Sequence, residues 1–208
     1  MATTDLTAVV VAVVGVAGTM GAPLLAQRAR RAETADQAAQ ADRERRENRE
    51  EVAFHSKREL YAALNSAARA YRIAAQDETL ALRRGDSVDP SNLDAARAAY
   101  NEQYAGSQMV LPDRPLKVAS EVNRCLGLGY KLARQLPTSP DRATAFGQAL
   151  GWYKGPLSDG VWLLRHALRE DLGVIPEFPD LLPLTTRLRS QRQQLGSELD
   201  AAPDRELP

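Results

Sequence analysis

The side chains most able to do chemistry are few: two histidines, His55 and His166, and a single cysteine, Cys125. Each histidine has a glutamate four residues away, in the pairs Glu51/His55 and His166/Glu170, so each pair could share one face of a helix. Di-iron helical bundles instead use Glu-x-x-His on two helices with two further glutamates, and this spacing does not occur here. One cysteine and two histidines also do not match a zinc-binding pattern. We therefore predict no metal site and no cofactor.

The sequence also lacks the motifs that bind phosphate or activate a nucleophile. There is no Gly-x-Gly-x-x-Gly or Walker-type loop, since Gly127 and Gly129 lie inside a helical pattern with no strand before them. There is no Gly-x-Ser-x-Gly elbow. A lone thiol fits a reducing compartment, and we interpret Cys125 as a small buried side chain. We predict that the protein is not an enzyme.

One stretch, from Gly147 to Trp162, has an unusual composition. It contains both tryptophans (the other is Trp152), Tyr153, four glycines and Pro156. Because tryptophan and tyrosine are enriched at interaction hot spots, Trp152, Tyr153 and Trp162 could form a partner or ligand surface. The alternative, which we favour, is a bend in which neighbouring helices bury both indole rings.

Helices must position these residues. Apolar residues recur at helical spacing from Val52 to about Arg84, and Gly85 then favours a helix end. Similar stripes predict helices over about residues 90–111, 113–136, 140–172 and 184–199. Gly155 and Pro156 interrupt the third of these, which is either one bent helix or two short ones. Gly127 and Gly129 cost roughly 1 kcal/mol each inside a helix, so we expect close packing there.

No stretch alternates as a strand does, so the predicted fold class is all-α. Short links between consecutive helices favour an antiparallel bundle of about four elements. The predicted divisions are a tail (1–5), an apolar helix (6–26), a charged stalk (27–51), the bundle (52–172), and a Pro-rich connector with a short terminal helix (173–208).

The stalk, residues 27–51, contains no large aliphatic or aromatic side chain. Its Ala, Arg, Glu and Gln residues form helices well but leave nothing to bury. A helix of this length would span about 37 Å at 1.5 Å per residue. A disordered tether is the alternative, and both remain open. A coiled coil of two stalks would be weak, because alanines would replace the usual Ile and Leu seam.

Residues 6–26 form a run without a charged side chain, and this run is long enough for one transmembrane helix. Asp5 precedes this run, and Arg28, Arg30 and Arg31 follow it. Positive charge stays on the cytoplasmic side, so we predict an inner-membrane anchor with the N-terminus outside and the bulk of the chain cytoplasmic. A cleaved signal peptide and a buried soluble helix are the alternatives. A signal peptide would begin with basic residues, and none precedes the run.

Small residues within this run repeat at a spacing that lets two membrane helices approach closely. They are Gly15, Ala17, Gly18, Gly21 and Ala22. Self-association through these residues is a hypothesis, and it makes a homo-oligomer a candidate assembly.

The distribution of charged residues along the chain indicates whether nucleic acid is a plausible partner. The chain has 27 basic and 27 acidic residues, and they are mixed along its length. Because nucleic-acid binding needs clustered positive charge, we predict no nucleic-acid partner.

The segment Lys57-Arg-Glu-Leu-Tyr61 is followed by Leu64-Asn65, Ala68-Arg69 and Tyr71-Arg72. This pattern resembles small single-pass membrane-anchored helical proteins of unknown function from GC-rich bacteria, over about residues 1–84. The resemblance implies one N-terminal membrane helix, an Arg/Glu-rich stalk and a helical domain, and it implies no site residues.

These observations leave three hypotheses for function. The first is a single-pass membrane-anchored cytoplasmic helical protein that scaffolds an unidentified protein partner and has no catalytic site. The second is a membrane-tethered bundle that senses a ligand. The third is an enzyme whose site is assembled from scattered residues.

Overall fold

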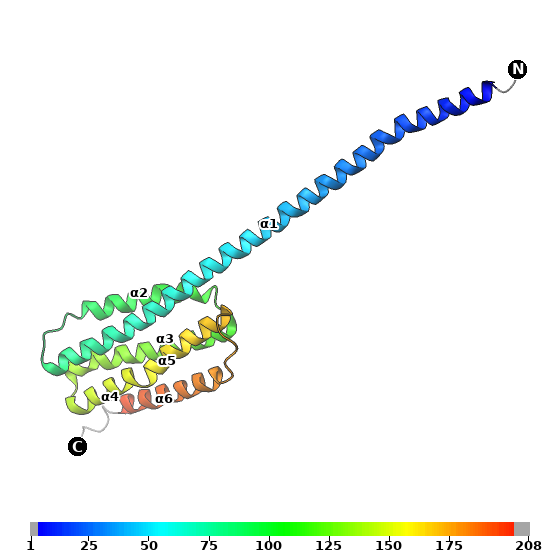
Figure 1. The fold of residues 1–208 in the computed structure, drawn as a ribbon. Helices are drawn as coiled ribbons and strands as arrows, with labels where there is room; N and C mark the ends of the chain where they lie inside the picture. The colour runs from blue at the N-terminus through cyan, green and yellow to red at the C-terminus, as the bar shows by residue number, and fades with distance from the viewer. Residues whose placement is uncertain (1–3, 202–208) are drawn as a thin grey trace. The chain divides into compact units, whose positions relative to one another are not determined.

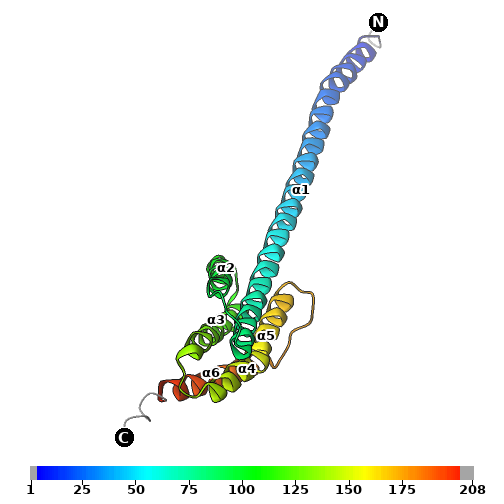
Figure 2. The same ribbon diagram turned by 90° about the vertical axis from the view of Figure 1, so that its left-hand side faces the viewer.

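The computed structural model describes the backbone of residues 4–201 and the side chains of residues 33–34 and 37–201. Over these residues the fold is all-helical with no strand, as predicted (Figure 1, Figure 2). The helices are α1 (Thr4–Arg84), α2 (Ser91–Gln108), α3 (Asp113–Gln135), α4 (Arg142–Lys154), α5 (Pro156–Asp171) and α6 (Leu181–Ala201), with a 3₁₀ turn, η1 (Leu136–Thr138), after α3. The chain divides into two units, Met1–His55 and Ser56–Pro208.

In the first unit, the backbone of the predicted stalk is helical. Its described side chains are exposed apart from Ala41, which is half-buried. An ion pair of Arg45 with Asp42 (3.8 Å) and a contact of His55 Nε2 with the Glu51 carboxylate (3.7 Å), both at helical spacing, accompany the strong helix-forming composition. The helix here has no apolar face to bury, in agreement with the sequence pattern.

Among the residues that the structure describes, no helix is both long and apolar enough to cross a membrane. The predicted membrane helix, residues 6–26, lies outside the residues whose side chains are described. The same holds for its proposed packing residues, Gly15, Ala17, Gly18, Gly21 and Ala22.

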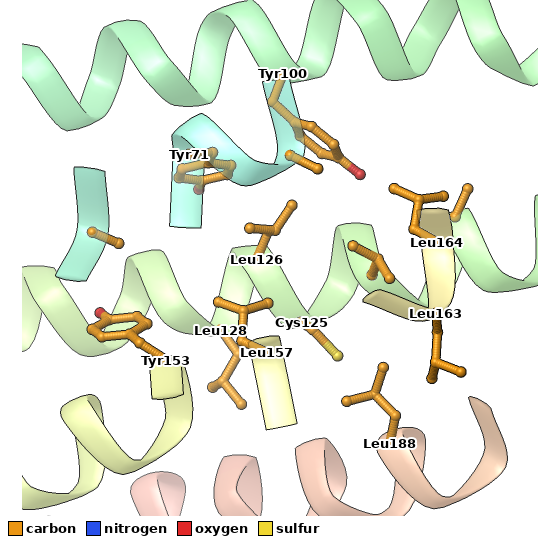
Figure 3. Packing of buried hydrophobic residues seen from close by; sticks show 14 of the residues in the cluster. Tyr71, Tyr100, Cys125, Leu126, Leu128, Tyr153, Leu157, Leu163, Leu164 and Leu188 are labelled. Atoms are coloured by element: carbon orange, nitrogen blue, oxygen red, sulfur yellow. The ribbon is translucent and has the colours of Figure 1, made fainter. Parts of the chain in front are cut away.

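The second unit is a helical bundle with α3 at its centre. This helix contacts α2, α4, α5 and α6, because its buried residues form one broad face. In Figure 3, Leu163 of α5 and Leu188 of α6 point toward one another in the core beside α3. The last part of α1 buries one stripe at steps of three and four residues: Tyr61, Leu64, Ala68, Tyr71 and Ala75. Burial of each large apolar side chain contributes about 1.5–3 kcal/mol.

Of the two alternatives for residues 140–172, the structure has two helices. Gly155 lies between α4 and α5, and its N–H donates to the carbonyl of Gly151 at 3.0 Å. Pro156 has no N–H to continue the ladder of α4 and instead begins α5, where a proline is tolerated. The start of α4 is two residues later than predicted, because Asp141 caps it by accepting a hydrogen bond from the N–H of Thr144 (3.1 Å).

The last helix differs most from the sequence prediction. It begins at Leu181, three residues before the predicted start, so Pro183 lies in its first turn rather than in the connector. It packs against α3 and α5, beyond the boundary of the bundle that we predicted at residue 172. It also runs parallel to α3, since Glu121 pairs with Arg192 and Lys131 with Asp200. The prediction of antiparallel neighbours concerns consecutive helices, and α3 and α6 are not consecutive.

Candidate functional site

Two of the three predicted surface residues, Trp152 and Tyr153 on α4, are buried against α3. The indole N–H of Trp152 donates to the carbonyl of Cys125 at 3.2 Å. The hydroxyl of Tyr153 donates to the carbonyl of Gly129 at 2.7 Å. Both polar atoms are therefore satisfied by backbone groups of α3, and both side chains belong to the core.

Gly129 permits this packing. A Cβ at this position would lie 3.0 Å from Cε1 of Tyr153 and 3.4 Å from Cδ2 of Leu157. The expected close approach is thus confirmed at Gly129. It is wrong at Gly127, where a Cβ would meet no atom within 4 Å.

Trp162, the third predicted residue, lies on α5 and is 38% exposed. Its ring lies against His166 in a tilted arrangement, with 3.8 Å between centroids, and meets Phe178 edge-on with 5.8 Å between centroids. It also lines a groove between α5 and α6, whose volume is about 470 Å³. Trp152, Tyr153 and Trp162 therefore do not form one surface, because the first two point into α3 and the third borders α6.

We define the Trp162 surface as Trp162 together with Asp159, Leu184 and Arg187, which line the same groove. Asp159 and Arg187 are exposed, and Leu184 is half-buried. The surface thus has an apolar centre and charged side chains of both signs beside it.

His166 is one of the two histidines that the sequence offers for chemistry, and its ring packs against aromatic neighbours. Its ring lies between Trp162 and Phe178, and its Nδ1 atom is buried without a hydrogen-bond partner among the described residues. Across the described residues, no group of three or more His, Cys, Asp or Glu side chains could hold a metal ion.

Sequence reasoning missed a charged cluster around Glu121 on α3. The side chain is fully buried, and it accepts hydrogen bonds from Nε of Arg192 (2.6 Å) and Nε of Arg189 (3.2 Å). The Cys125 thiol lies 3.8 Å from the same carboxylate, and burial together with the Glu121 charge raises its pKa. The signal was present in the sequence, because Glu121 interrupts the apolar stripe that contains Val118 and Cys125.

A second charged cluster joins α1, α2 and α3 through Arg134. Its guanidinium binds Glu78 at 3.1 Å, Asp94 at 2.6 Å and the carbonyl of Pro90 at 2.8 Å. The Arg134 hydrogen bond, with a further one from the Tyr130 hydroxyl, lowers the pKa of Asp94. Burial raises the pKa of Glu78, and the Arg134 charge opposes this. These carboxylates are paired across helices, which is an arrangement that stabilises the fold.

A cavity of about 580 Å³ lies near the end of α3, between α3, η1, α4 and α6. Gln135, Leu136, Thr144, Gln148 and Glu198 contribute to its wall. Its lining mixes amides, hydroxyls and the two carboxylates of Asp141 and Glu198 with leucine side chains.

No protein-family model, curated protein or solved structure matches this chain.

Proposed function

We propose that this chain is a single-pass membrane-anchored helical protein whose bundle binds a protein partner at the Trp162 surface. The sequence supports the anchor. Residues 6–26 are uncharged over a length that suits one membrane crossing, and Arg28, Arg30 and Arg31 follow them. These arginines favour a cytoplasmic location for everything after the run.

The half-exposed indole of Trp162 is the observation that carries the proposal for partner binding. His166 and Phe178 hold the ring from two sides, so little side-chain entropy is lost when a partner covers it. Rigid tryptophans within an apolar patch dominate the energy of many protein interfaces. Asp159 and Arg187 supply the polar rim that such interfaces have.

The charged groups support a binding role rather than catalysis. The buried carboxylate of Glu121 is paired with arginines from α6, and that of Glu78 is paired with Arg134. Both ion pairs join different helices of the bundle. Glu121 is fully buried, and Glu78, which lines a small pocket, has its Oε1 paired with Arg134 at 3.1 Å.

A ligand-sensing bundle is the second candidate, and the cavity beside η1 favours it. Its volume of about 580 Å³ lies in the range of small-molecule sites, and its wall combines polar and apolar side chains. The Trp162 surface does not border this cavity, so the two functions can be tested separately.

The experiment is affinity purification of the full-length, C-terminally tagged chain from membranes after chemical cross-linking. The proposal predicts a partner that is retained by the wild type and lost with Trp162→Ala. Ile73→Ala is the matched control, because Ile73 has nearly the same exposed fraction (37%) but lies on α1. Equal retention by Trp162→Ala and Ile73→Ala would contradict the assignment of this surface.

A further inference from the structure

A second surface of the bundle has a different chemistry. A furrow of about 660 Å³ runs between α3 and α6. Its walls include Arg124, Gly127 and Lys131 from α3, and Arg192, Gly196 and Asp200 from α6. The α3 residues recur at steps of three and four, and the α6 residues recur at steps of four, so each set lies on one helix face. We call this site the α3–α6 furrow.

Positive charge exceeds negative charge at one end of the furrow. Arg124, Arg189 and Arg192 all lie within 4 Å of Glu121, and this one buried carboxylate neutralises only one of the three. The side chain of Arg124 is more than half exposed, so its guanidinium is available to an incoming anion.

At the other end of the furrow, a carboxylate of the chain itself is bound by a lysine. Lys131 Nζ lies 2.6 Å from the Asp200 carboxylate, and both side chains are exposed. Asp200 therefore pairs with the Lys131 ammonium group, to which a carboxylate of an acidic partner could bind instead.

At two glycines of the furrow, the described residues leave the space open. A Cβ at Gly127 or at Gly196 would meet no atom within 4 Å. At Gly129 and Gly160, by contrast, a Cβ would come within 3.0 Å of Tyr153 or 2.9 Å of Leu188. Glycine lowers helix stability, yet at Gly127 and Gly196 nothing in the described structure compensates. Bare backbone at these two positions allows another chain to approach closely.

We propose that the α3–α6 furrow binds an acidic segment of a partner protein. One carboxylate of the segment pairs with the Arg124/Arg192 end, and the segment crosses Gly127 and Gly196 toward Lys131. Seven residues separate Arg124 from Lys131, which is about 10 Å along a helix and suits two acidic side chains of one peptide better than one small anion. The exposed Gln193 amide also lines the furrow and can pair with a peptide backbone. This site is separate from the Trp162 surface and stands independently of the function proposed above.

The test uses the full-length chain in a neutral detergent and fluorescein-labelled hexaglutamate as the probe, with hexaglutamine as the uncharged control. Anisotropy is expected to show binding of hexaglutamate alone, and binding is expected to weaken as ionic strength rises. Arg124→Gln should weaken binding about threefold, and Asp200→Asn should strengthen it about threefold, as for exposed ion pairs.

Gly127→Ala separates binding from folding. An alanine favours the helix, so the melting temperature should rise while hexaglutamate binding falls. Gly147→Ala is the matched control, because a Cβ there also meets no atom within 4 Å but the residue lies on α4, away from the furrow. It should raise the melting temperature and leave binding unchanged.

Several results would overturn the proposal. One is equal hexaglutamate binding by the wild type, Gly127→Ala and Arg124→Gln. Another is binding of inorganic phosphate or of phosphatidylglycerol vesicles with no binding of hexaglutamate, which would assign the furrow to a different anion. Trp162→Ala should leave hexaglutamate binding unchanged. A negative result for the furrow is therefore distinguishable from a negative result for partner binding at the Trp162 surface.

Discussion

Arg192 of α6 donates a 2.6 Å hydrogen bond from Nε to the fully buried carboxylate of Glu121 on α3. Together with the Lys131–Asp200 pair, it joins α6 to the central helix in a parallel orientation. It also explains how a charged residue is tolerated within the apolar stripe of α3, because a buried carboxylate is stable only when it is paired.

The first prediction concerns this pair. Arg192→Gln should lower the free energy of unfolding by about 2 kcal/mol, because it leaves a buried carboxylate less well paired. The double variant Glu121→Leu/Arg192→Leu should lose less than the single variant, because no buried charge remains. Urea denaturation of the full chain measures both, with Arg187→Gln on the exposed face of α6 as the control. A double variant less stable than Arg192→Gln would contradict the explanation.

The second prediction compares two glycines of α3. Gly129→Ala should destabilise the bundle by about 1–3 kcal/mol, because the Tyr153 ring is held by its hydrogen bond and cannot move away from a new methyl group. Gly127→Ala should stabilise it by about 1 kcal/mol, because the space around it is open. Thermal unfolding should therefore shift in opposite directions for the two variants. Shifts of the same sign would mean that one of these environments is misassigned.

The third prediction is a pH dependence. Because Arg134 lowers the folded pKa of Asp94 below its usual value of 3.8, the ionised Asp94 stabilises the folded state. This stability is fully present above pH 3.8 and is lost as the pH falls through the lower, folded pKa. Asp94→Asn should thus be less stable than the wild type at neutral pH, and the difference should shrink in acid. Denaturation at a series of pH values checks this, and a difference that grows as the pH falls would have the wrong sign.

The fourth prediction separates the two tryptophans. Trp152 is 3% exposed and Trp162 is 38% exposed, so acrylamide should quench only the fluorescence of Trp162 efficiently. Trp162→Phe should remove the quenchable component, and Trp152→Phe should retain it. Efficient quenching in the Trp162→Phe variant would show that the Trp152 ring is accessible.

The fifth prediction concerns Cys125, whose thiol is buried beside Glu121. Because burial and the neighbouring charge raise its pKa, little thiolate forms at neutral pH. A thiol-reactive dye should label the folded chain far more slowly than the chain in urea. Similar labelling rates in the two states would contradict the buried environment.

The sequence predicted the parts of this fold that depend on local pattern. The stripe from Tyr61 to Ala75 indicated which face of α1 is buried, and Asp113 marked the start of α3. The start of α6 was missed because Pro183 suggests a connector, whereas a proline in a first helical turn is also allowed.

The candidate site was less predictable, because it depends on contacts between distant residues. Composition grouped Trp152 with Trp162, but the break at Gly155 separates their helices and turns the first toward α3 and the second toward α6. The partners of Glu121, 68 and 71 residues away, could not be inferred from spacing along the chain.

Membrane anchoring is the central claim of the proposed function, and alkaline extraction of isolated membranes tests it most directly. The full-length chain should remain in the membrane pellet. A variant with Val13→Arg and Val14→Arg should be released, since each arginine at the centre of a membrane helix costs about 2.5–3.5 kcal/mol. Wild-type chain recovered entirely in the soluble fraction would contradict the anchor.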